Sequence, residues 1–114
     1  MLQNARNRHV VARHLLTAFD SNSRRTGLLG RETFGDAGAM IIAPTNAIHT
    51  FFMRFPIDVA FVARSGRVVK TCHGVRPWRI AATLRAYAAI ELPAGTLSRC
   101  ETVIGDVFQV VAGR

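Results

Sequence analysis

The stretch Ala47–Arg64 reads AIHTFFMRFPIDVAFVAR. It places one histidine, one arginine and one aspartate among residues that otherwise favour buried β-strands. A polar group inside an apolar setting costs roughly 1–3 kcal/mol unless it is paired. His49, Arg54 and Asp58 therefore require partners within the fold or a role at a site.

The same stretch predicts strands over Ile48–Arg54 and Val59–Arg64. Pro56 separates them, because proline has no amide hydrogen to donate to a sheet. Ser65–Gly66 then favours a tight turn, after which Arg67–Cys72 returns as another strand. The last two strands form the clearest hairpin in the chain.

Further strands are expected on both sides of this hairpin. Short apolar segments predict them over Val10–Phe19, Ala39–Ala43, Tyr87–Leu92 and Val107–Val111. The pattern indicates one domain over residues 1–114 of the α+β class, mainly β. Its short strands are expected to curl into a small barrel-like sheet, which would remove exposed edges, with one or two short helices.

Polar residues at positions 20–22 are good N-caps, so Ser23–Leu29 is expected to form a short helix. Gly30 follows at the C-terminal end, where a left-handed residue is commonly needed. Ile80–Leu84 is compatible with one further helical turn.

Two glycines mark turns in the C-terminal third of the chain. Gly95 closes the turn Pro93–Gly95, and Gly105 precedes Asp106 at the start of the last strand. Glycine permits a tight bend, and an aspartate caps a turn through the nearby backbone. No GxxxxGK or GxGxxG surrounds them, so we interpret both as structural turns rather than phosphate loops.

The chain is basic, with a net charge of +8 and a pI near 11.4. Lys70 is the single lysine among 15 basic residues, and the arginines are scattered from Arg6 to Arg114. No run of five or more basic residues marks a nucleic-acid tail, so the charge pattern disfavours a nucleic-acid partner without excluding one.

Neither a signal-like apolar segment nor a membrane span is present near the start of the sequence, and we expect a cytoplasmic protein. Cys72 and Cys100 lie far apart and form no CxxC pair. They are expected to be buried thiols rather than a disulfide or metal ligands. We therefore expect no metal and no cofactor.

Four segments occur in one order: RRTGLLGR (Arg24–Arg31), IHTFFMRFPIDVAFV (Ile48–Val62), ELPAG (Glu91–Gly95) and GD (Gly105–Asp106). Together they resemble the "domain of unknown function 192" family of small prokaryotic proteins, over about residues 17–112. The resemblance implies a small, single, mainly β domain. It implies no agreed activity, substrate or cofactor.

The candidate ligand site combines His49, Arg54 and Asp58 with Glu91, an isolated carboxyl in the apolar strand YAAIEL. An arginine beside a carboxylate gives a fork for an anion, and a histidine can transfer a proton near neutral pH. The structural alternatives are that Asp58 locks a turn and that Glu91 pairs with Arg25 or Arg54.

Trp78 lies between Pro77 and Arg79, with Arg76 close by. Such a tryptophan is either a lid over the core or a stacking platform for a sugar ring or a base. The sequence thus predicts a non-catalytic binding or accessory domain for a small anionic or polyhydroxylated ligand. A hydrolase or lyase using His49 with Asp58 or Glu91, and a nucleic-acid-binding module, are the alternatives.

Overall fold

The computed structural model describes residues 1–18 and 38–112 of the chain. The strands there are β1 (Leu2–Asn4), β2 (Val10–Ala12), β3 (His14–Ala18), β4 (Gly38–Ile42), β5 (Ala47–His49), β6 (Ile57–Val62), β7 (Val68–Val75), β8 (Ile80–Ala82), β9 (Ala88–Pro93) and β10 (Phe108–Val110). One short helix, α2 (Thr96–Arg99), lies between β9 and β10. The predicted helix Ser23–Leu29, with Gly30 and Arg25, lies outside the described residues.

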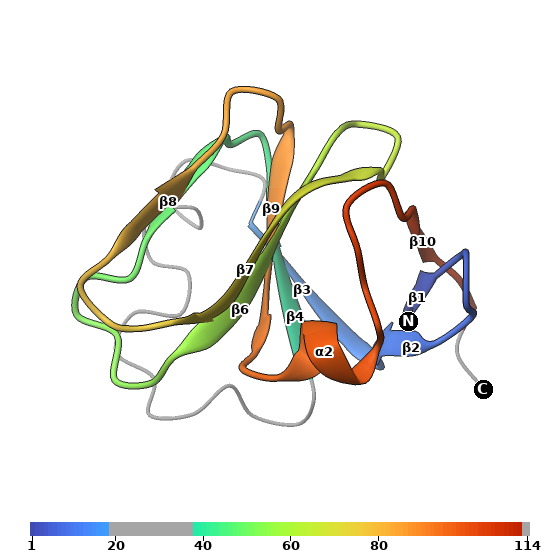
Figure 1. Cartoon of the computed structure of the whole chain (residues 1–114), viewed down its shortest axis with the longest axis horizontal. Coiled ribbons are helices and arrows are strands. Elements are labelled where there is room, and N and C mark those ends of the chain that lie inside the picture. The colour runs from blue at the N-terminus through green and yellow to red at the C-terminus, as the bar shows by residue number, and fades with distance from the viewer. Residues whose placement is uncertain (19–37, 113–114) are drawn as a thin grey trace.

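A five-stranded sheet in the order β3-β4-β9-β6-β7 forms the centre of the molecule (Figure 1). β3 and β4 are parallel, and the other neighbours in this sheet are antiparallel. The predicted hairpin is confirmed, because β6 pairs with β7 across the turn at Ser65–Gly66. Gly66 has φ of +88°, and a Cβ there would overlap the carbonyl oxygen of Phe108, so the turn requires glycine.

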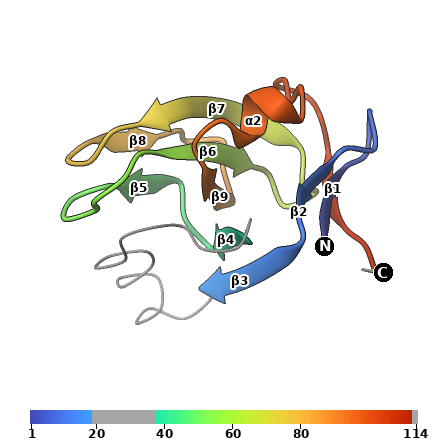
Figure 2. The same ribbon diagram turned by 90° about the horizontal axis from the view of Figure 1, so that it is seen from below.

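Two smaller sheets flank the central one on opposite sides (Figures 1 and 2). A three-stranded sheet, β10-β1-β2, lies at the end that carries both termini. The two-stranded sheet β5-β8, here called the arm, lies at the other end. The prediction of a barrel-like sheet is corrected: the described strands form three open sheets. The strands that would close the central sheet pair with one another instead, β5 with β8 and β1 with β2 and β10.

Three strand assignments also differ from expectation. Val10–Phe19 contains two strands, because the chain bends at Arg13 and the second strand joins a different sheet. The strand predicted over Ile48–Arg54 ends at His49, where Thr50 bonds to the loop ahead of β8 instead of to a neighbouring strand. Ile80–Leu84 contains β8 rather than a helical turn. Leu2–Asn4 and the helix after Gly95 were not predicted.

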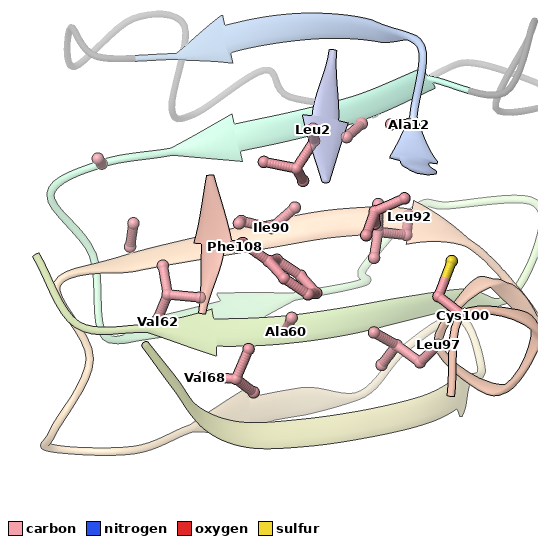
Figure 3. Close-up of a cluster of buried hydrophobic side chains, with 14 residues drawn as sticks. Leu2, Ala12, Ala60, Val62, Val68, Ile90, Leu92, Leu97, Cys100 and Phe108 are labelled. Atoms are coloured by element: carbon pink, nitrogen blue, oxygen red, sulfur yellow. The ribbon is translucent and has the colours of Figure 1, made fainter. Parts of the chain in front are cut away.

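The apolar side chains of the central sheet form one cluster on each face, as the alternation along a strand requires. The terminal core, which includes Leu2, Ala60, Val62, Ile90, Leu97 and Phe108, fills the space toward β1, β10 and α2 (Figure 3). The arm core, which includes Met40, Ile48, Ile57, Val59, Phe61 and Ala89, lies on the face toward the arm. Any polar residue of β6 or β9 therefore belongs to one face or the other.

A polar network joins the two ends of the chain. Asp106, with its side chain 3 % exposed, accepts hydrogen bonds from Arg6 Nε at 2.6 Å and Asn4 Nδ2 at 2.9 Å. It also accepts the amide hydrogen of Val103 at 3.0 Å, so it caps the turn that contains Gly105, which has φ of +100°. The hydrogen bond from Arg6 holds the pKa of Asp106 well below its ordinary range, at about 2.

This network makes stability sensitive to acid. A carboxyl whose pKa is lowered by folding contributes stability above its unfolded pKa of about 3.9, and that stability is lost as the pH falls toward 2. We expect about 2 kcal/mol of unfolding free energy to be lost between pH 5 and pH 2 through Asp106. Urea denaturation of Asp106→Asn should show a smaller loss over that range, whereas Arg8→Gln, an exposed change in the β1–β2 connection that also carries Arg6, should behave like the wild type. Equal pH profiles for wild type and Asp106→Asn would contradict this assignment.

No helix in residues 1–18 or 38–112 is long and apolar enough to cross a membrane.

Candidate functional site

The structure separates the two carboxyl groups of the predicted pocket. Asp58 on β6 alternates with Val59 and shares a face with Ala60, in the terminal core. Glu91 on β9 alternates with Ile90 and lies on the opposite face, toward the arm core. Asp58 and Glu91 therefore do not line the same pocket.

Asp58 is fully buried, and its carboxyl group is bound by backbone amides. Gly74 N–H donates to Oδ1 at 2.8 Å, and Leu97 N–H donates to Oδ2 at 2.9 Å. Leu97 is in the first turn of α2, whose N-cap residue Gly95 supplies no side-chain hydrogen bond. Asp58 thus caps α2 from a neighbouring strand and holds the end of β7, in agreement with the turn-locking interpretation.

Glu91 is 4 % exposed and lies between its register partners Met40 and Val59. Burial raises the pKa of Glu91 to about 7. No ion pair joins Glu91 to Arg54 among the residues that the structure describes. The other predicted partner, Arg25, lies outside those residues.

His49 and Arg54 are both exposed, one at the end of β5 and one in the connection to β6. The amide hydrogen of Phe51 is donated to His49 Nδ1 at 3.3 Å. Arg54 has an interaction of its own and is not a free cation. Pro56 is exposed immediately ahead of β6, where its missing amide hydrogen costs the sheet nothing.

What the fold does bring together is a row of aromatic rings at the arm. The ring of His49 stacks on Phe51 with centroids 4.9 Å apart, and Phe51 stacks on Trp78 at 5.7 Å. The rings of Phe52 and Trp78 also contact each other, with centroids 4.6 Å apart and ring planes inclined at 59°. Phe52 is 67 % exposed and Trp78 is 55 % exposed. These four residues are called the aromatic cluster below.

Thr50 positions the aromatic cluster. Its hydroxyl donates to the carbonyl of Arg76 at 2.6 Å and accepts the amide hydrogen of Arg79 at 2.8 Å. Its backbone carbonyl accepts the amide hydrogen of Trp78 at 2.9 Å. A single, fully buried threonine therefore ties the turn with Phe51 to the loop that carries Trp78. Sequence reasoning missed Thr50, because a threonine between two aromatic residues carries no signal of its own.

The backbone at the cluster is in an uncommon conformation. Phe52 has φ of +66° and Trp78 has φ of +67°, in the left-handed region that bulky residues rarely adopt. Each such residue costs on the order of 1–2 kcal/mol. The fold thus holds two exposed aromatic side chains in place against a local energetic preference, which is a common feature of binding sites.

Arginines flank this cluster. Arg76 and Arg79 are exposed on either side of Trp78, and Arg79 Nη1 donates to the Trp78 carbonyl at 3.3 Å. A guanidinium beside an aromatic face can bind an anionic group while the ring stacks on the ligand body. The local charge therefore favours ligands that carry a negative group.

The described residues provide no cluster of side chains suited to binding a metal ion. Within residues 1–18 and 38–112, no group of three His, Cys, Asp or Glu side chains could hold a metal ion. Cys72 is half-buried, and Cys100 is buried with Sγ 3.5 Å from the Val10 carbonyl. Burial raises the pKa of both thiols.

Solved structures share this fold at low sequence identity. A protein of unknown function from Novosphingobium aromaticivorans DSM 12444 superposes with a TM-score of 0.76 at 22 % identity, covering 90 % of this chain and 80 % of that one. A protein from Sinorhizobium meliloti 1021, described as a "putative transcription regulator", also gives a TM-score of 0.76 at 22 % identity and covers 83 % and 79 %. No curated protein matches the chain.

The chain also matches a family model, and the match includes all four ordered segments noted in the sequence. It extends over residues 2–110, and so includes the β1 strand and the whole arm. The chain belongs to the DUF192 family, described as "Uncharacterized ACR, COG1430".

Proposed function

We propose that this protein is a non-catalytic binding module whose aromatic cluster takes a small ligand that is anionic or polyhydroxylated. The observation that carries the proposal is the contact of the exposed Phe52 and Trp78 rings with each other and with the half-buried Phe51, held in place by Thr50. Aromatic rings bind the apolar face of a sugar, or a base, by stacking.

The exposure of Trp78 supports a platform rather than a lid. A lid over the core would bury most of the indole, whereas Trp78 is 55 % exposed and is in neither core cluster. Its ring contacts are with Phe51 and Phe52, which lie in the connection that follows β5. Trp78 therefore forms part of the exposed surface beside the arm and does not fill the hydrophobic core.

The flanking arginines favour a ligand with a carboxylate or phosphate beside its ring, such as a uronic acid or a sugar phosphate. The contacts of the carboxyl groups argue against the hydrolase or lyase alternative. Asp58 is held by two backbone amides and Glu91 is buried in the sheet, whereas His49 is exposed at the end of β5. A paired acid and base would need to converge on one site.

Because Trp78 is the single tryptophan, its fluorescence reports directly on the cluster. We expect glucuronate or glucose 6-phosphate to change the emission in a saturable way, and glucose to bind more weakly because it lacks the anionic group. Stacking is worth about 1–3 kcal/mol per ring, so Trp78→Ala should weaken binding about 5- to 150-fold by calorimetry. Its unfolding free energy should change by less than about 1 kcal/mol.

Two further variants separate binding from stability. Thr50→Val keeps the indole but removes the hydroxyl that holds the loop, so it should weaken binding with Trp78 still present. Leu84→Ala, at a side chain 94 % exposed near the end of β8, is the matched control and should bind like the wild type. A large loss of stability in Trp78→Ala with unchanged binding would instead identify a structural lid.

A single-stranded oligonucleotide belongs in the same titration, since one structural relative is described as a "putative transcription regulator". Binding that falls steeply with salt, and exceeds that of the sugar acids, would replace the small-ligand proposal with a nucleic-acid-binding module.

A further inference from the structure

We infer that the molecule has a second binding site, separate from the aromatic cluster, for a small amphipathic carboxylate with an apolar body. The site is a cavity of about 420 Å³ between the central sheet and the strands β1 and β10. Its lining combines apolar side chains of the terminal core, among them Leu2, Ile90 and Phe108, with Arg64 and Tyr87.

The floor of this terminal cavity is apolar and already formed. Leu2, Ile90 and Phe108 are each less than 5 % exposed and belong to the terminal core. In Figure 3 their side chains, with that of Val62, gather in the space between the central sheet and the strands β1 and β10. Because these residues are fixed by core packing, a ligand would enter without rearranging the fold.

The rim of the cavity supplies a cation. The guanidinium of Arg64 lies over the ring of Tyr87, 4.6 Å from its centroid, and both residues line the cavity. No Asp or Glu is among the lining residues that the structure describes. An apolar floor with one cation at its edge is complementary to an apolar chain or ring that ends in a carboxylate.

The size of the cavity fits this class of ligand. Small-molecule sites have volumes of roughly 300–1,000 Å³, and an apolar cavity of about 150 Å³ already binds benzene. A volume of about 420 Å³ therefore accommodates a medium-chain fatty acid or an aryl carboxylate.

The two proposed sites carry separate intrinsic reporters. The chain has one tyrosine and one tryptophan, and Tyr87 lines the terminal cavity while Trp78 belongs to the aromatic cluster. No residue of the aromatic cluster is among the residues that line the terminal cavity, so either site can fail without the other.

Octanoate, used below its micelle concentration, is the probe for the terminal cavity. In protein labelled with 3-fluorotyrosine we expect the single ¹⁹F signal to shift in a saturable way with octanoate, and Trp78 fluorescence to stay unchanged. Calorimetry should give at least tenfold weaker binding for 1-octanol, which has the same chain but no charge, and weaker binding still for octylamine.

Arg64→Gln tests the role of the cation. This variant should bind octanoate and 1-octanol with similar affinities, because the guanidinium is what distinguishes them. Arg67→Gln is the matched control, since Arg67 is exposed in the same turn but does not line the cavity, and it should retain the wild-type preference. An unshifted ¹⁹F signal, equal binding of octanol and octanoate by the wild type, or the same loss in Arg67→Gln would each overturn the inference.

Discussion

Replacing Asp58 with asparagine is expected to lower the free energy of unfolding by about 3 kcal/mol. Asp58 is fully buried, and its two oxygens accept the amide hydrogens of Gly74 and Leu97. An asparagine has one acceptor oxygen, so its amino group would face one of these donors. A buried donor without an acceptor costs about 1–3 kcal/mol, and the misplaced amino group adds a second such cost.

Urea denaturation measured by circular dichroism tests this expectation. The matched control is Glu101→Gln, an acid-to-amide change just after α2 at a side chain 74 % exposed, which should shift stability by no more than about 0.5 kcal/mol. If Asp58→Asn were as stable as the wild type, Asp58 would not be needed for folding, and the search for a ligand site should return to it.

Stability is also expected to fall as the pH rises from about 4.5 to 8, because of Glu91. Burial raises the pKa of Glu91 to about 7, whereas an unfolded glutamate titrates near 4.3. A raised pKa means that the folded state disfavours the ionised form. The penalty is absent below the unfolded pKa, grows between the two pKa values and is complete above the folded one, where it amounts to about 4 kcal/mol.

Glu91→Gln separates this effect from other titrations. The variant keeps the shape of the side chain without the charge, so its stability should be flatter with pH and should exceed that of the wild type at pH 8. Urea denaturation at several pH values provides the comparison. A pH dependence identical to the wild type's would show that Glu91 stays ionised in the folded protein, as a paired carboxylate would.

Asp106 and Glu91 together set the expected pH of maximum stability. Asp106 contributes stability that is lost below about pH 4, and Glu91 imposes a penalty that grows above about pH 5. The optimum for folding is therefore expected at mildly acidic pH, although the chain carries a net charge of +8 at pH 7.

Local patterns predicted the hairpin well. β6 and β7 are joined by a short turn in which Gly66 is required by both its dihedral angle and its contact with Phe108. The turn that follows Pro93 and includes Gly95, and the bend at Gly105, were also evident, because proline fixes its own φ and glycine permits the left-handed φ that both glycines adopt. The geometry of these turns is set by residues that are close together in the sequence, so it can be predicted from local sequence patterns.

Local sequence patterns could not predict which strands pair when the strands are far apart in the sequence. Whether β1 joins β10, or β5 joins β8, depends on contacts across the whole chain, and nothing in a three-residue strand specifies its partner. The barrel prediction was wrong for this reason, since it assumed that short strands would continue one sheet.

The candidate site divides in the same way. The sequence by itself singled out the residues that need an explanation, since Asp58 and Glu91 are carboxyls in apolar strands and Trp78 lies between arginines. Only the tertiary structure decided their roles. Strand alternation and pairing sent the two carboxyls to opposite faces, and the buried hydroxyl of Thr50 brought Trp78 against Phe51. Chemistry resides in residue types, but proximity comes from long-range packing, and a site requires both.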